Sequence, residues 1–384
     1  MNFVPYVIVF FLIYISSFYV SDYNTIRKNK DNYVGYLFLL SSLVLFFGCR
    51  GFIYTDWINY AKEYNQFPNS FSRFISNFSS IEYEPGFAFF LFLCKLFRNY
   101  FFLQFFSFLI DLVILLKALQ KLRSSNIALF FLFFITFKGI EIEFNLLRNS
   151  KSIMLFVYSL YYVIKERNFK TYFFINLIGA LFHVSALLYI PLYFFIKHKF
   201  HYRFYLSVFV LGLSVFALRI PICKRLIEFI CSFFPNGRAI SHLIYYLDSE
   251  TFSAPVLFST IYIERIGTFF LMLVLYRKLV RTEENIYFIN ILTLYYIVCL
   301  FCWDFYVIVQ RVTVLFICSS WFIFPEMIKL FKDKRVRCLI VFICFIYGSF
   351  KLYKDTSIPI MKYSLCFFEK PYAVKEAQTW KYLK

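Results

Sequence analysis

The sequence has few charged residues, and this scarcity argues against a soluble globular protein. Only 16% of the 384 residues are Asp, Glu, Lys or Arg, whereas a soluble domain has about 25%. Hydrophobic residues make up 61% of the chain, and apolar runs long enough to cross a bilayer recur along its length. The sequence therefore predicts a helical protein that crosses a membrane many times.

Other features are missing as well. The start has no short hydrophobic segment followed by a small-residue cleavage site, so residues 2–20 are expected to form a first span rather than a removed signal peptide. No internal repeat or low-complexity linker interrupts the chain, which predicts one integral membrane domain over residues 1–384. The CxxC pair Cys299 and Cys302 lies in an apolar run without a second pair, which favours buried apolar side chains over zinc or redox chemistry. We expect no metal and no cofactor.

Positive charge is abundant, because 41 Lys and Arg residues face only 22 Asp and Glu residues, for a formal net charge of +19. The basic residues are concentrated in short connections between apolar runs, which is the bias that sets membrane orientation. This distribution argues against nucleic-acid binding. We place six connections in the cytoplasm, at 21–32, 121–125, 165–170, 197–203, 277–281 and 329–337.

These six connections determine the expected membrane path by parity. Spans are expected at about 2–20, 33–48, 100–120, 126–140, 148–164, 204–220, 260–276, 286–303, 305–324 and 338–352, with two short broken spans in 171–196 that turn near His183. The run 86–97 is too short to cross, so it is expected to be interfacial or re-entrant. Both termini and the loops 49–85 and 221–259 are placed outside. The second loop is amphipathic, which is typical of a helix on the outer leaflet or over a cavity.

This path puts most of the unusual polar residues on the outer side. Arginines suit an anion, because a guanidinium stays charged and grips phosphate with paired donors, and carboxylates and histidine suit base catalysis on a hydroxyl. The residues are Arg50, Asp56, Tyr60, Glu82, Glu84, Glu141, Glu143, Asn145, Arg148, His183, Ser185, Arg238, His242, Asp248, Glu250, Asp304 and Arg311. A transporter would be expected to place ionisable groups near the midplane, in two matching halves.

Structural explanations compete for the arginines. Arg50 at the end of the second span can extend its charge to the lipid headgroups. Arg148 and Arg311 lie beside apolar runs, where an unpaired charge costs about 2.5 kcal/mol or more. An ion pair with Glu143 or with Asp304 is the alternative to a ligand-binding role.

Structural explanations also compete for the histidine and for the first acidic motif. His183, between two apolar residues, fits a hydrogen-bonded core histidine. Pro85 fits a first helical turn, where Glu84 meets the positive end of the helix dipole.

Four short motifs in order resemble one protein family. They are "RGFIYTDWINYAKEY" at 50–64, "YEPGF" at 83–87, "NLLRNSKSIMLF" at 145–156 and "LFHVSALLYIPLY" at 181–193. Together they resemble the EpsG-like branch of the Wzy-type bacterial polysaccharide polymerases, which build O-antigen, capsule or exopolysaccharide. In the last motif valine stands where proline is common. The expected fold class is therefore all-α, a polytopic integral membrane protein with about 11–13 transmembrane helices, a short re-entrant or interfacial helix and a GT-C-like arrangement.

The resemblance implies a multi-pass glycosyltransferase in the bacterial cytoplasmic (inner) membrane. It would join undecaprenyl-diphosphate-linked oligosaccharide repeat units at the outer face, without a metal, moving the growing glycan to a sugar hydroxyl of the next unit. Asp56, His183 and Glu84 are the acid/base candidates. Arg50, Arg148 and Arg311 are the candidates for the diphosphate, with Tyr60 and Trp57 for the sugar and Arg238 as a further substrate-binding candidate. The implied partners are the lipid-linked donor and acceptor, membrane lipid, a chain-length regulator and a flippase.

Three other functions remain open from the sequence. An O-antigen ligase would use the same chemistry with another acceptor. A transporter or flippase of lipid-linked oligosaccharide would line a central cavity with charges. A structural assembly subunit would tolerate the loss of Arg148 or His183.

Overall fold

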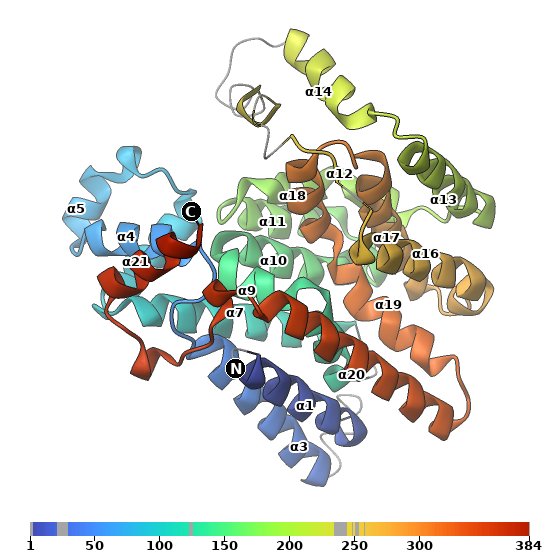
Figure 1. Cartoon of the computed structure of the whole chain (residues 1–384), viewed down its shortest axis with the longest axis horizontal. Coiled ribbons are helices and arrows are strands. Elements are labelled where there is room, and N and C mark those ends of the chain that lie inside the picture. The colour runs from blue at the N-terminus through green and yellow to red at the C-terminus, as the bar shows by residue number, and fades with distance from the viewer. Residues whose placement is uncertain are drawn as a thin grey trace. The chain divides into compact units, whose positions relative to one another are not determined.

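The computed structural model describes residues 3–20, 30–122, 126–233, 244–247, 249, 253–256 and 258–383. This part of the chain is helical, with no β-strand and one isolated bridge between Arg50 and Leu365. The elements are α1 (Val4–Tyr19), α3 (Lys30–Leu43), η1 (Val44–Gly48), α4 (Trp57–Gln66), α5 (Phe71–Ser76), η2 (Phe78–Ser80), α6 (Pro85–Lys95), α7 (Tyr100–Lys121), α8 (Ile127–Phe134), η3 (Ile135–Gly139), α9 (Ile140–Asn145), α10 (Leu147–Ile164), α11 (Phe169–Ala180), η4 (Val184–Leu188), α12 (Tyr189–Lys197), α13 (Tyr202–Ala217), α14 (Ile222–Phe233), α16 (Thr260–Leu279), α17 (Glu284–Phe301), α18 (Tyr306–Phe316), α19 (Cys318–Lys329), α20 (Lys334–Thr356), η5 (Pro359–Met361), η6 (Cys366–Phe368) and α21 (Tyr372–Leu383) (Figure 1).

The chain divides into two compact units. The first unit comprises Met1–Tyr193 and Phe331–Lys384, and the second comprises Phe194–Leu330. The expectation of one integral domain over residues 1–384 stays a prediction.

Several helices have the length and composition of membrane spans. Among the described residues, α7, α17 and α20 are long and apolar enough to cross a bilayer, and the bent pairs α13–α14 and α18–α19 raise the number to five. Shorter apolar helices occupy Val4–Tyr19, Asn32–Gly48, Pro85–Lys95 and Val184–Lys197. The all-α polytopic membrane fold is confirmed. Helix length alone does not count the spans, so the expected number of about 11–13 and the GT-C-like arrangement stay predictions.

In the first unit, α10 packs against α7 and α11, and α1 packs against α3, α8 and α20. Helix starts are set by side chains that accept orphan backbone N–H groups. Asn99 accepts from Phe101 N at the start of α7, and Asn126 accepts from Leu129 N at the start of α8. A hydrophobic cluster joins residues of α4, α6 and α7, including Trp57.

The expected break near His183 is present. Helix α11 ends at Ala180, and η4 begins at Val184. The span expected over 126–140 is interrupted, because Phe137 and Lys138 leave helical geometry and Lys138 has a φ of 68°. The span expected over 305–324 consists of α18 and α19, which are bent by 56° at their junction.

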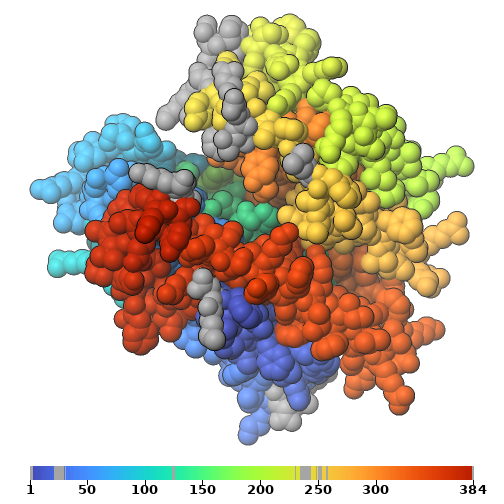
Figure 2. Space-filling view, in the orientation of Figure 1, coloured from blue at the N-terminus to red at the C-terminus, as the bar shows by residue number. Residues whose placement is uncertain are grey.

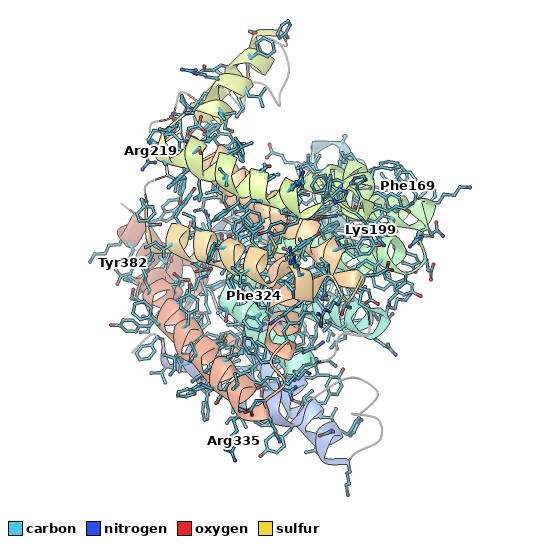
Figure 3. The ribbon with its side chains drawn as sticks, turned by 90° about the vertical axis from the view of Figure 1, so that its right-hand side faces the viewer. Phe169, Lys199, Arg219, Phe324, Arg335 and Tyr382 are labelled. Atoms are coloured by element: carbon cyan, nitrogen blue, oxygen red, sulfur yellow. The ribbon has the colours of Figure 1, made fainter. Side chains whose placement is uncertain are left out.

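In the second unit, α17 packs against α13, α16, α18 and α19. Buried polar groups join its helices: the Tyr205 hydroxyl donates to Asn290 Oδ1 over 2.6 Å, and Arg265 Nε donates to the Tyr295 hydroxyl over 3.1 Å. Figure 3 shows α13 running from near Lys199 to Arg219, alongside α16. The expected amphipathic helix of the 221–259 loop is α14.

Candidate active site

A polar pocket of about 320 Å³ lies in the first unit. Its walls combine carboxylates, cations, an amide and two phenol rings. They come from the start and the outward face of α4, from the residues that precede α6, and from the start of α10. The lining residues are Asp56, Asn59, Tyr60, Lys62, Glu63, Glu82, Tyr83 and Arg148. Three of the candidate site residues, Asp56, Tyr60 and Arg148, therefore meet at one pocket, and Glu82 of the expected outer polar residues joins them.

Arg148 is held on one wall by an acid and an aromatic ring. Its Nη1 donates to Glu84 Oε2 over 2.8 Å, and its guanidinium carbon lies 4.9 Å from the centre of the Tyr83 ring. The side chains of Arg148 and Glu84 are 29% and 18% exposed. The ion pair predicted for Arg148 thus exists, but its partner is Glu84 rather than Glu143. The sequence motifs at 83–87 and 145–156 contact each other through this pair.

Tyr60 lines the pocket together with Asp56 and Arg148. Burial raises the pKa of its hydroxyl above the ordinary value, and the neighbouring Arg148 guanidinium opposes this rise. The nearby Asp56 carboxylate raises the pKa of Tyr60 further. The hydroxyl is therefore neutral near pH 7, and it remains able to donate a hydrogen bond.

Glu84 also joins the pocket to the turn at 181–185. Its second oxygen, Oε1, accepts from Val184 N over 3.3 Å. Beside it, Gly86 N donates to Leu181 O over 2.8 Å. A Cβ on Gly86 would lie 2.8 Å from the same Leu181 oxygen, so the close approach of α6 to this turn needs glycine.

His183 lies in this turn and is half-buried. Its Nδ1 accepts from Ser185 N over 3.2 Å and lies 2.7 Å from Ser185 Oγ. Ser185 Oγ donates to Asn149 Oδ1 over 3.0 Å, one residue after Arg148. The histidine is thus linked through Ser185 and Asn149 to the start of α10, but it is not among the residues that line the pocket.

Asn145, one of the polar residues expected at the outer side, holds the backbone at Asp56. Asn145 Oδ1 accepts from Asp56 N over 3.1 Å and from Thr55 N over 3.3 Å. This places Asp56 at the N-cap of α4. Asn59 and Glu63 continue the same face, at the i, i+3 and i+7 spacing of a helix, and that periodicity was the available signal for them.

Two predicted residues lie elsewhere in the first unit. Arg50 is 1% exposed, its Nη2 donates to Glu143 O over 2.6 Å, and its other terminal nitrogen donates to Phe47 O. Trp57 is also 1% exposed, and its ring stacks on Phe52 with 4.2 Å between centroids. The structure therefore uses Arg50 to join η1 to α9 and Trp57 to pack the core, and neither lines the pocket.

Of the predicted residues that are described, Arg311 and Asp304 belong to the second unit. The Arg311 guanidinium lies 5.1 Å from the centre of the Tyr246 ring. Asp304, proposed as its ion-pair partner, accepts from Cys223 N and Lys224 N at the start of α14 over 3.3 and 2.9 Å. Arg238 lies outside the described residues. Among those that are described, no group of three or more His, Cys, Asp or Glu residues is placed to hold a metal ion.

A buried charged pair of α7 and α10 was not expected from the sequence. Lys151 Nζ lies 2.6 Å from Asp111 Oδ2, with side-chain exposures of 1% and 0%. The Lys151 ammonium also donates to Ser107 Oγ, and Ser150 Oγ donates to Asp111 Oδ2 over 2.8 Å. Charges inside apolar helices are costly and pair for that reason. The pair joins α7 to α10 one turn after Arg148.

Comparison with known proteins identifies one family. The model of the EpsG family matches residues 33–365, which is most of the chain and includes all four motifs. No curated protein and no solved structure matches the chain significantly.

Proposed function

The chain belongs to the EpsG family, whose members are Wzy-type polymerases, and we propose that it polymerises undecaprenyl-diphosphate-linked oligosaccharide repeat units. The reaction would take place at the outer face of the bacterial cytoplasmic membrane. Both substrates are lipid-linked, which fits a multi-pass membrane protein. The resulting polymer would be a surface polysaccharide.

One observation carries the proposal: residues from three separate motifs meet at the pocket. Asp56 and Tyr60 come from the first motif, Tyr83 from the second and Arg148 from the third, and Glu84 of the second motif pairs with Arg148. Glycan transfer from a diphosphate needs an acceptor base and a cation for the leaving group. A pocket lined by Asp56 and Arg148 supplies both groups.

In the proposed reaction, a hydroxyl oxygen of the next repeat unit attacks the anomeric carbon of the growing glycan. The new carbon–oxygen bond forms as the bond from that carbon to the lipid diphosphate breaks. Asp56 accepts the hydroxyl proton. Arg148 stabilises the negative charge of the departing diphosphate, because a guanidinium has five N–H donors and can hold Glu84 while presenting others.

The other residues support these two roles in the proposal. Glu84 orients Arg148 by the 2.8 Å ion pair and is less suited to act as the base itself. Tyr60 and Tyr83 supply the hydroxyl and the ring face for a sugar, a role that the buried Trp57 fills less well. Arg50 acts through the backbone that it joins. His183 remains an alternative base, and Arg311 an alternative diphosphate ligand.

The test is electrophoresis of surface polysaccharide from a deletion strain. The strain is complemented with the wild type, Asp56→Ala, Arg148→Ala or His183→Ala at matched protein levels. We expect Asp56→Ala and Arg148→Ala to reduce the amount of long-chain polymer by about 10²-fold or more, as for removal of an essential donor or base. Lys170→Ala, which changes an exposed cation in α11 that does not line the pocket, is the control and should keep most of the long chains.

The pattern of products separates the alternative functions. Single repeat units at the surface without long chains support a polymerase. Loss of delivery of any repeat unit would support a flippase instead, and normal chains left unattached to their final acceptor would support a ligase. A normal ladder from both Asp56→Ala and Arg148→Ala would refute the site.

A further inference from the structure

The C-terminal segment crosses the loop that begins the first motif. Arg50 pairs with Leu365 in an isolated antiparallel bridge. Gly51 N donates to Ser364 O over 2.7 Å, and Cys366 N donates to Cys49 O over 2.9 Å. Both segments belong to the first unit. More than 300 residues of sequence separate them, so this contact forms only in the folded chain.

Further contacts extend this pairing in both directions along the loop. Tyr54 N donates to Ile360 O over 3.1 Å. The Tyr372 hydroxyl donates to Ile58 O over 3.2 Å, in the first turn of α4. In Figures 1 and 2 the red C-terminal segment accordingly lies beside the light-blue segment that contains α4. Residues 358–372 therefore hold the backbone on both sides of Asp56, at residues 49–54 before it and at Ile58 after it.

Glu369 is the acidic residue of segment 358–372, and its side chain contacts the loop that begins the first motif. Its side chain is 3% exposed, and its Oε2 accepts from Phe52 N over 2.7 Å. The Ser364 hydroxyl donates to the same oxygen. The Lys375 ammonium lies 3.6 Å from Oε1. A buried carboxylate with this set of partners is anchored, and it anchors Phe52 in turn.

Gly51 is matched to this carboxylate. A Cβ at Gly51 would lie 1.8 Å from Glu369 Oε2 and 2.6 Å from Ser364 Oγ. Any larger residue must displace Glu369 or the loop. The glycine after Arg50 in the first motif is therefore explained by close packing against the C-terminal segment.

From these contacts we propose that Glu369 is a positioning residue for the candidate active site. It fixes Phe52, whose ring stacks on Trp57 in the first turn of α4. That turn begins at the N-cap, Asp56, so displacement of Phe52 shifts the proposed base relative to Arg148. The inference rests on the proposed function, because its consequence for activity is loss of polymerisation.

The experiment compares Glu369→Ala, Glu369→Gln and Lys370→Ala in the full-length protein. Glu369→Gln keeps an oxygen that accepts from Phe52 N, whereas Glu369→Ala removes it. Lys370→Ala changes the exposed neighbour and is the matched control. We expect Glu369→Ala to reduce long-chain polymer about tenfold at matched protein level. Glu369→Gln should restore most of it, and Lys370→Ala should leave it unchanged.

A second readout is independent of activity. Cys49 and Cys366 flank the paired segments and are half-buried free thiols. A short bifunctional thiol reagent should join them in membranes, and mass spectrometry can quantify the joined peptides. The yield should fall in Glu369→Ala and recover in Glu369→Gln. If Glu369→Ala lowers the protein level, Gly51→Ala replaces it in both measurements and should give the same two losses.

Two results would overturn the inference. One is normal polymer from Glu369→Ala at matched level, and the other is shortened polymer with an unchanged Cys49–Cys366 yield. Failure of the proposed function is distinguishable. In that case Arg148→Ala also keeps full-length polymer, while the cross-linking yield still reports whether Glu369 holds the loop.

Discussion

The buried pair of Lys151 and Asp111 gives the sharpest energetic prediction. The two side chains are 1% and 0% exposed, and 2.6 Å separates Lys151 Nζ from Asp111 Oδ2. Asp111→Ala leaves the ammonium with neutral hydroxyls as acceptors. Removing one partner of such a buried pair costs about 3–5 kcal/mol, which is a large part of a typical folding free energy of about 5–15 kcal/mol.

A double-mutant cycle isolates the coupling. Asp111→Ala and Lys151→Met are each expected to lower the midpoint of thermal unfolding in detergent. The double variant should recover much of the loss, because it buries no unpaired charge. Glu283→Ala and Lys199→Ala are matched controls, since that ion pair is 69% and 53% exposed and should contribute about 0–1 kcal/mol.

The reasoning would be refuted by single variants as stable as the wild type, or by a double variant that loses the sum of the single losses. Either result means that the two charges do not stabilise each other. Since the pair joins α7 to α10 one turn after Arg148, the cycle also tests what holds Arg148 at the pocket.

Three further predictions concern the site. Arg148→Lys should keep a cation but lose the planar donor set, so long-chain polymer should fall about tenfold or more on gels, and wild-type chain lengths would contradict a guanidinium-specific role. Gly86→Ala should destabilise the protein by about 1–3 kcal/mol, as overpacking does, because the new Cβ would lie 2.8 Å from Leu181 O; Gly267→Ala, with no atom within 4 Å, is the control in the same thermal assay. Asn145→Ala should shorten the polymer without loss of protein, because Asp56 N loses its 3.1 Å acceptor, and unchanged chain lengths would argue against this positioning.

Helix positions were largely predictable from the sequence. Apolar runs and basic connections located α1, α7, α10 and α20 to within a few residues, because each depends on local hydrophobicity and length. The turn near His183 followed from the need to keep two basic connections on one side. The break at Lys138 was not predictable, since a positive φ in an apolar run depends on packing around it.

The sequence predicted which residues form the site better than it predicted which of them contact each other. Motif order indicated that Asp56, Glu84 and Arg148 belong together, but the sequence offered Glu143 as the partner of Arg148. The actual partner, Glu84, lies 64 residues away in sequence and meets Arg148 only through the packing of α6 near α10. Asp111 was overlooked because a single acid in an apolar run has no local partner from which to infer a pair.

The contribution of the C-terminal segment was beyond the reach of local patterns. Nothing near Gly51 in the sequence indicates that Glu369 packs against it, and contacts between distant segments have no periodic signal. The same limit applies to Arg50, whose neighbours Phe47 and Glu143 come from two different elements. Arg50 is buried in the structure and Arg148 is not, although the sequence alone favours both arginines equally as anion ligands.

The most direct test of the proposed function is elongation by the purified protein. The full-length chain is reconstituted in liposomes with undecaprenyl-diphosphate-linked repeat units, and the products are resolved by length. Wild type should convert single units into a ladder of longer lipid-linked glycans, and so should the control Lys170→Ala. Asp56→Ala and Arg148→Ala should leave the units single. A wild-type protein that leaves the units single, or an Arg148→Ala protein that elongates them at the wild-type rate, would contradict the account.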